Sequence, residues 1–172
     1  TKQDYVNITK DAGLVGLGGS GFPTYIKLNT KNKIDIILAN GVECEPKLIS
    51  DYEVMMQSPE ELIQGLIYSM KAVGAPKGII AVKKRYVELV ERIRFSLNSY
   101  TEYDITVVPV GNHYPQGWEL EAIEAATGIK VPQFKLPADY GIIPFNVSTL
   151  QSIYHAVKFN LPVLERYFVL SG

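Results

Sequence analysis

The sequence predicts an α/β fold, with a parallel, Rossmann-like sheet, helices on both faces and a glycine-rich loop ahead of the first core strand. Short apolar runs that suit buried strands alternate with longer segments of helical periodicity. Glycine, proline and polar residues fall between these segments, where elements are expected to end. A chain of 172 residues is long enough for one domain with a substantial core. We therefore expect residues 1–172 to form a single domain.

The first half of the chain is predicted to contain a helix, then a strand, then a second helix. Residues 4–12 are expected to form a short helix that ends at Gly13. Residues 34–39 are a continuous apolar run, which is typical of a buried parallel strand. The next helix is expected to begin at Ser58, because a serine, a proline and two acids follow one another there, and its apolar spacing continues to residue 73.

The second half continues the alternation of strands and helices. We expect strands at residues 78–83, 105–110 and 166–170, and helices at residues 86–97, 118–126 and 147–159. Residues 131–144 contain three prolines and are predicted to form a long irregular loop. A loop of that length in a compact domain is often functional.

Composition excludes several classes of function. A net charge of −1 gives no reason to expect nucleic acid or an acidic membrane surface as a partner. No apolar run reaches the length of a membrane span. The one cysteine, Cys44, cannot form an internal disulfide and makes a poor metal site with two histidines, which favours a reducing compartment. Because the chain starts at Thr1 without an initiator methionine, we expect it to be a fragment of a longer protein.

A glycine-rich loop precedes the first predicted strand, and its glycines are Gly16, Gly18, Gly19 and Gly21. Such a backbone can turn successive amide N–H groups toward one anion. Pro23 suits the first turn of a helix, so the loop should lead to a helix N-terminus that also favours phosphate. The loop also matches the dinucleotide pattern G-x-G-x-x-G, but that pattern requires a preceding strand. The alternative to an anion-binding loop is a tight turn whose glycines only permit close packing.

A polar turn follows the first predicted strand, about twenty residues after the glycine loop. Its Asn40, Glu43 and Glu45 would lie at the carboxyl end of that strand, where open α/β sheets bind ligands. Carboxylates there can accept hydrogen bonds from ribityl or ribose hydroxyls, and an amide can both donate and accept. The alternative is a solvent-facing turn with ordinary surface acids. Cys44 is expected to be a small packed residue rather than a nucleophile.

Five separated motifs resemble the flavin-binding domain shared by RnfC proteins and the NADH-binding flavoprotein subunit of respiratory complex I. They are residues 18–24 with Lys27, residues 40–46, residues 114–117 with Glu119, residues 136–139 and residues 146–150. They occur in order from about residue 12 to residue 172. Cys44 in the acidic turn and the Pro-Gln-Gly sequence at residues 115–117 resemble the RnfC branch, which includes the cobalamin reductase PduS and the proline-reductase-associated PrdC, more than complex I.

The resemblance implies FMN as a non-covalent cofactor, NADH as the hydride donor, and iron–sulfur clusters in a part of the parent protein outside this chain. It assigns the FMN phosphate and ribityl region to Gly16, Gly18, Gly19 and Gly21. It assigns flavin contacts to Lys27, Asn40, Glu43 and Asn146. Phe22 and Glu45 would line the nicotinamide side, Glu119 would close the pocket, and Thr149 is a further polar candidate.

Several positions depart from the complex I pattern. Val42 stands in place of an acid, Thr30 in place of a second aromatic residue, and Phe145 in place of the first of two asparagines. Trp118 replaces a small or acidic residue. These departures concern the dinucleotide more than the flavin.

Three functional hypotheses follow. The first is a flavin-binding oxidoreductase module that works with the iron–sulfur domain of its parent chain and other subunits of a redox complex, in the cytoplasm or at the cytoplasmic face of a membrane. The second is a docking module with a vestigial pocket, which the departures motivate. The third keeps the flavin but changes the donor or acceptor, as in the proline- and cobalamin-reductase branches.

Overall fold

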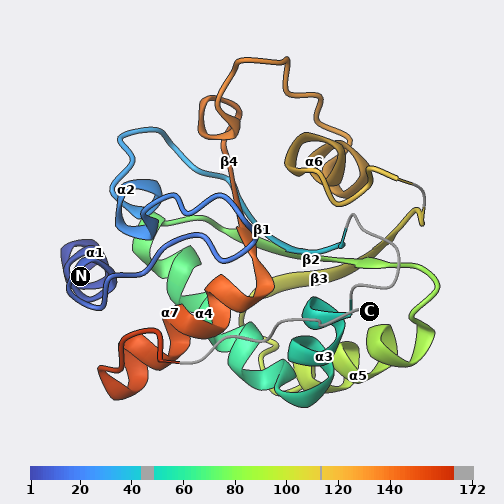
Figure 1. The fold of residues 1–172 in the computed structure, drawn as a ribbon, viewed down its shortest axis with the longest axis horizontal. Coiled ribbons are helices and arrows are strands. Elements are labelled where there is room, and N and C mark those ends of the chain that lie inside the picture. The colour runs from blue at the N-terminus through green and yellow to red at the C-terminus, as the bar shows by residue number, and fades with distance from the viewer. Residues whose placement is uncertain (44–48, 113, 165–172) are drawn as a thin grey trace, which may run out of the picture.

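The computed structural model describes residues 1–43, 49–112 and 114–164. Within that part of the chain, four strands form one sheet with the order β3-β2-β1-β4 (Figure 1). The strands are β1 (Ile36–Gly41), β2 (Lys77–Lys83), β3 (Asp104–Val110) and β4 (Ile142–Asn146). Every pair of neighbours is parallel. The predicted α/β fold with a parallel sheet is therefore confirmed.

Helices cover both faces of the sheet, as expected. They are α1 (Lys2–Asp11), α2 (Thr24–Leu28), α3 (Ser50–Gln57), α4 (Pro59–Val73), α5 (Val87–Leu97), α6 (Glu119–Thr127) and α7 (Val147–Phe159), with a short 3₁₀ helix, η1 (Pro137–Tyr140). Figure 1 shows α3, α4, α5 and α7 on one side of the strands and α6 on the other. The glycine loop lies ahead of β1, between α1 and α2.

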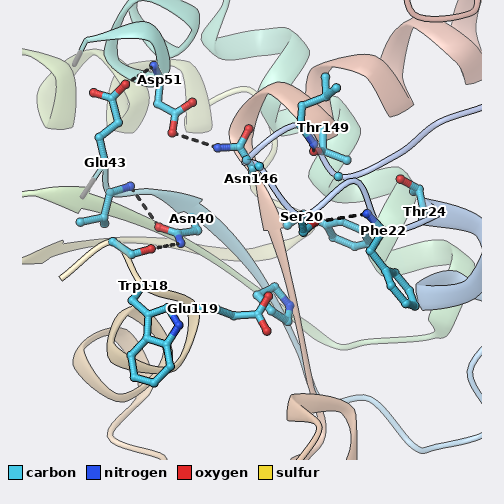
Figure 2. Close-up of a pocket in the computed structure, with 18 of the residues that line it drawn as sticks. Ser20, Phe22, Thr24, Asn40, Glu43, Asp51, Trp118, Glu119, Asn146 and Thr149 are labelled. Atoms are coloured by element: carbon cyan, nitrogen blue, oxygen red, sulfur yellow. Dashed lines mark hydrogen bonds between the residues drawn. The ribbon is translucent and has the colours of Figure 1, made fainter. Parts of the chain in front are cut away.

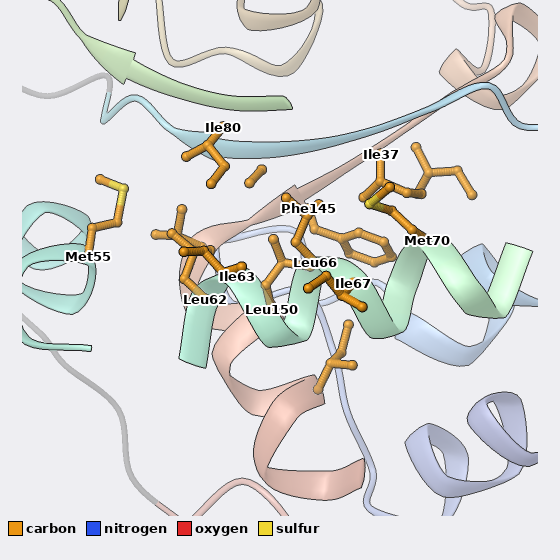
Figure 3. Packing of buried hydrophobic residues seen from close by; sticks show 14 of the residues in the cluster. Ile37, Met55, Leu62, Ile63, Leu66, Ile67, Met70, Ile80, Phe145 and Leu150 are labelled. Carbon is orange, nitrogen blue, oxygen red and sulfur yellow. The ribbon is translucent and has the colours of Figure 1, made fainter. Parts of the chain in front are cut away.

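The larger part of the core lies between the sheet and helices α4 and α7. Leu62, Ile63, Leu66 and Ile67 of α4 are almost fully buried and face apolar side chains of the strands (Figure 3). A methyl group added at Gly65 would overlap the backbone carbonyl of Leu150, so α4 and α7 approach each other backbone to backbone. This contact fixes the position of α7, whose N-cap residue is Asn146 and whose first turn contains Thr149. A smaller apolar cluster, which includes Leu38, Ile79 and Ile123, packs α6 against the other face.

The prediction of an irregular segment over residues 131–144 is wrong at its end, because β4 begins at Ile142. The three prolines of this segment favoured the prediction of a loop over that of a strand. Pro144 lies inside it, opposite Leu38 of β1, but within the described part of the chain β4 pairs only with β1 and so forms an edge of the sheet. An edge strand tolerates a proline, which has no N–H to give to a ladder.

Other boundaries differ more modestly. The first strand begins at Ile36 rather than at residue 34, because parallel pairing with Ile142 starts there, although Ile34 is also buried. Helix α3 was not predicted. The expected strand at residues 166–170 lies outside the described residues.

The chain order of the strands creates a switch point between β1 and β4. From β1 the chain crosses through α3 and α4 to β2 on one side, and later returns through α6 to β4 on the other side. In open α/β sheets, ligands bind beyond the carboxyl ends of the strands at such a point. Asn40 and Asn146 are paired in register at this place.

Candidate functional site

A cavity of about 640 Å³ opens at the switch point between β1 and β4. Figure 2 shows its two ends: Ser20, Phe22, Thr24 and Thr149 lie at one end, and Asn40, Glu43, Asp51 and Trp118 lie at the other. The glycine loop and the polar turn after β1 therefore line the same cavity. Among the residues predicted from the sequence, its lining contains Gly16, Gly18, Gly19, Phe22, Lys27, Asn40, Glu43, Glu119, Asn146 and Thr149.

Two predicted residues are not in this lining. Gly21 lies at the neck of the loop, where its N–H donates to the carbonyl oxygen of Gly16 at 3.1 Å. The N–H of Gly16 donates in turn to the carbonyl oxygen of Phe22 at 2.8 Å. Gly21 thus closes the loop rather than facing the cavity. Glu45 lies outside the described residues, as does Cys44.

The glycine loop requires glycine at particular points. Gly19 has φ +103° and Gly21 has φ +59°, and the first of these values is poorly accessible to residues with a side chain. Gly18 lies against Asn146, and a Cβ added there would be 3.0 Å from the Cβ of Asn146. The N–H of Leu17 donates to the Thr149 hydroxyl at 2.9 Å, which attaches the loop to the first turn of α7. Thr149 therefore supports the loop as well as lining the cavity.

Lys27 joins three segments across the cavity. Its ammonium donates to the carbonyl oxygen of Pro144 at 2.8 Å and lies 3.5 Å from a carboxylate oxygen of Glu119. It also lies 5.5 Å from the centre of the Phe145 ring. Helix α2, strand β4 and the start of α6 are thereby linked through one positive charge. Because the Glu119 side chain is nearly half exposed, that ion pair contributes at most about 1 kcal/mol.

Asn40 connects the end of β1 to the loop before α6. Its amide nitrogen donates to the carbonyl oxygen of Gly117 at 3.0 Å, and its amide oxygen accepts from the N–H of Val42 at 3.1 Å. An asparagine amide has two N–H donors and an oxygen with two lone pairs. Part of its hydrogen-bonding capacity is therefore still available to a ligand.

Glu43 and Asp51 form a hydrogen-bonded network that sequence reasoning missed. One carboxylate oxygen of the buried Glu43 accepts from the Ser50 hydroxyl at 2.9 Å and from the N–H of Asp51 at 3.0 Å. The Asp51 carboxylate accepts from the side-chain amide of Asn146 at 2.9 Å. Ser50 with Glu53 three residues later has the spacing of a helix N-terminal capping box, which could have indicated α3 but not this network, although the N-cap position is taken by Ile49.

Thr24 was also missed, and it is the one buried side chain among the described residues whose oxygen has no hydrogen-bond partner. It lines the glycine-loop end of the cavity and is 1% exposed. Leaving a buried hydroxyl unpaired costs about 1–3 kcal/mol. An acceptor such as a phosphate oxygen, placed against the loop amides, would remove that cost. The donors present at this end therefore fit the anionic tail of a cofactor.

Membrane spans and metal clusters are both absent from the described residues. No helix in residues 1–43, 49–112 and 114–164 is long and apolar enough to cross a bilayer. Within the same ranges, no group of three or more histidine, cysteine, aspartate or glutamate residues is arranged to hold a metal ion.

A glycine loop and a set of amides and carboxylates line one cavity at the switch point of a parallel sheet, which is the arrangement typical of a cofactor-binding α/β domain. Comparison with protein families makes the class specific. Residues 9–155 match the model of the Nuo51 FMN-binding domain, and the chain belongs to that family.

Individual relatives agree with this assignment. The chain is 37% identical over 164 residues to one subunit of the Na⁺-translocating ferredoxin:NAD⁺ oxidoreductase complex of Acetobacterium woodii, covering 94% of this chain and 37% of that protein. It is 38% identical over 161 residues to the cobalamin reductase PduS of Citrobacter freundii, covering 94% of this chain and 34% of that protein. The resemblance to RnfC proteins and PduS is confirmed. The chain thus spans about a third of the length of these relatives.

Solved structures confirm the fold. One chain of an NAD⁺-reducing [NiFe]-hydrogenase in the H₂-reduced state superposes with a TM-score of 0.81 at 24% identity. The match covers 92% of this chain and 31% of that one.

Proposed function

We propose that this chain binds FMN in the cavity between β1 and β4 and serves as the NADH-oxidising module of an RnfC-like redox complex. FMN held there would supply the redox chemistry, namely acceptance of hydride from NADH and release of single electrons to iron–sulfur clusters outside this chain. The observation that carries the proposal is the shared cavity of the glycine loop and the Asn40–Glu43 turn. Family membership supports the same cofactor.

The glycine-loop end of the cavity would hold the phosphate. The loop amides and the unpaired Thr24 hydroxyl are donors, and phosphate oxygens are acceptors. Helix α7 begins beside the loop, and the positive end of a helix dipole also favours an anion. These groups orient the cofactor by its tail.

The other end would hold the ring. Asn40, Glu43, Asn146 and Lys27 present amide, carboxylate and ammonium groups around the space where a flat ring would lie. Phe22, at the glycine-loop end of the same cavity, is 42% exposed, and its ring would be available to a nicotinamide placed over the flavin. Glu119, held by Lys27, would close the pocket over the ring. The proposed role of the protein is to stack and orient two rings.

A pair of glycine variants tests FMN binding. Gly19 and Gly128 both have positive φ and open space where a Cβ would be, but only Gly19 lines the cavity. We expect Gly19→Ala to weaken FMN binding about tenfold or more, measured by quenching of FMN fluorescence, because the loop amides would turn away from the phosphate. Gly128→Ala also places a side chain at positive φ, in the milder left-handed region, and should leave the affinity unchanged. An unchanged chain that quenches no FMN fluorescence would contradict the proposal.

The docking alternative is decided by the same titration. Phe145 and Trp118, which depart from the complex I pattern, both line the cavity and motivate this second reading. Tight quenching that depends on Lys27 and Asn40 would eliminate a docking-only role.

The direct electron donor needs a separate experiment. Anaerobic mixing of the FMN-loaded chain with NADH should bleach the flavin absorption band. A band that persists would remove NADH as the donor and favour the third hypothesis, a different donor or acceptor. Work with other subunits, at the cytoplasmic face of a membrane, is proposed from relatives that are subunits of ion-translocating complexes.

A further inference from the structure

Asp51 lies on the cavity wall at the start of α3 and faces the amide of Asn146 across the space between α3 and α7 (Figure 2). We propose that Asp51 is a positioning residue, which orients the Asn146 amide so that an N–H, rather than the carbonyl oxygen, faces the bound flavin cofactor. The inference rests on the proposed function, because it assigns a role toward FMN.

The two ends of the Asn146 amide have different partners. The amide nitrogen donates to the Asp51 carboxylate at 2.9 Å, and the amide oxygen accepts from the N–H of Ser148 at 2.9 Å. Turning the amide over would place its oxygen against a carboxylate and its NH₂ group against an N–H. Both contacts would then be repulsive, so Asp51 and Ser148 together select one orientation.

The selected orientation leaves a donor for the cavity. An amide nitrogen carries two N–H groups, and the structure shows one of them occupied by Asp51. Asn146 lines the cavity, and Gly18 packs against its side chain from the loop. The remaining N–H can therefore serve an acceptor oxygen of FMN.

Asp51 is itself held from the other side. The buried Glu43 accepts from the N–H of Asp51 and from the hydroxyl of the neighbouring Ser50, which fixes the first turn of α3. The polar turn after β1 thereby reaches Asn146 through Asp51.

The test compares three variants by FMN titration and by the melting temperature of the FMN-free chain. Asp51→Asn retains an acceptor oxygen for Asn146 and should bind FMN within about twofold of the unchanged chain. Asp51→Leu removes the acceptor and should weaken binding about tenfold. A matched control is Asp139→Leu, because Asp139 accepts from the Asn32 amide at 3.0 Å in an exposed pair outside the cavity lining.

The exchanged pair Asp51→Asn with Asn146→Asp separates positioning from mere attachment of α3 to α7. Asn at 51 can donate to Asp at 146, which can still accept from the N–H of Ser148, so the melting temperature should stay near that of the unchanged chain. The N–H directed at the ligand is lost, so the exchanged pair should bind FMN about tenfold more weakly than the unchanged chain. This variant keeps the proposal testable if Asp51→Leu does not fold.

The outcomes are distinguishable. If the unchanged chain binds FMN and the exchanged pair binds equally well, Asp51 only attaches α3 to α7 and the inference is overturned. Normal FMN binding by a folded Asp51→Leu variant would overturn it as well. If the unchanged chain fails to bind FMN, the proposed function fails and the inference fails with it.

Discussion

Thr24 shows how a single buried side chain can indicate a ligand-binding position. Its hydroxyl is buried and unpaired, although most buried polar groups in proteins are hydrogen-bonded. Its backbone N–H is used, since it donates to the carbonyl oxygen of Leu14 at 2.9 Å. Only the side-chain hydroxyl of Thr24 therefore has no hydrogen-bond partner, and Thr24 lies in the wall of the cavity.

Thr24→Val should separate stability from binding. Valine has nearly the same shape, so the FMN-free chain should keep its free energy of unfolding or gain about 1 kcal/mol, because an unpaired hydroxyl is removed. FMN binding should weaken about tenfold if the hydroxyl donates to the phosphate. Urea unfolding and FMN fluorescence titration measure the two quantities.

Thr9→Val is the matched control for this variant. Thr9 is equally buried, but its hydroxyl lies within hydrogen-bond distance of the carbonyl oxygens of Tyr5 and Val6 and can donate to them. Its loss should destabilise the chain by about 1 kcal/mol and leave FMN affinity unchanged. A Thr24→Val variant that is destabilised like Thr9→Val and binds FMN normally would contradict the assignment.

The residues of the site differ in how far the sequence could predict them. The glycines, Asn40 and Glu43 could be found because each carries a local signal, either backbone freedom or a position after an apolar strand. Thr24 and Asp51 carry no such signal. Their importance depends on which segments the fold brings together: Asp51 matters because α7 places Asn146 opposite it.

At the scale of elements, helix α7 organises the cavity. Its N-cap residue Asn146, at the end of β4, donates to Asp51 of α3, and Thr149 in its first turn accepts from Leu17 of the glycine loop. Its position depends on the close contact between its backbone at Leu150 and Gly65 of α4. Gly65 does not line the cavity, but a substitution there should shift α7 and thereby alter the site.

Gly65→Ala tests this dependence. Alanine gains about 1 kcal/mol of helix propensity over glycine, but its methyl group would overlap the Leu150 backbone, which cannot rotate away as a side chain can. We expect the overlap to dominate, with a net loss of about 1–3 kcal/mol in the free energy of unfolding and weaker FMN binding. Circular dichroism melts and FMN titration measure these effects.

The control for that variant is Gln64→Ala, at the neighbouring position of α4, where the side chain is partly exposed. It should change neither stability by more than about 0.5 kcal/mol nor FMN affinity. A Gly65→Ala chain that is as stable as this control would show that α4 and α7 do not depend on the contact.

Elements differ in predictability for a physical reason. Helix α4 and strand β2 were predicted because their periodicity and end signals agree with their tertiary environment. Strand β4 was missed because Pro144 opposes strand formation locally and is acceptable only at the edge of a sheet, which the sequence does not reveal. The missed strand supplies Phe145 and Asn146 to the cavity.

At the scale of the whole molecule, the order of the strands places the site. Because β1 is flanked by β2 and β4, the connection from β1 to β2 and the later connection from β3 to β4 pass on opposite sides of it, and the space beyond its carboxyl end is open to a ligand. The glycine loop reaches this space through its attachment to α7 rather than by following a strand. That arrangement differs from the ordinary dinucleotide-binding motif, in which the loop follows the first strand directly.

The measurement that tests this account most directly is gel filtration of the chain after incubation with FMN, with absorbance recorded in the protein and flavin bands. We predict that the flavin band elutes with the protein at one FMN per chain. Flavin that elutes only in the small-molecule fraction, from a folded chain, would contradict the assignment of the cavity between β1 and β4 as a flavin site.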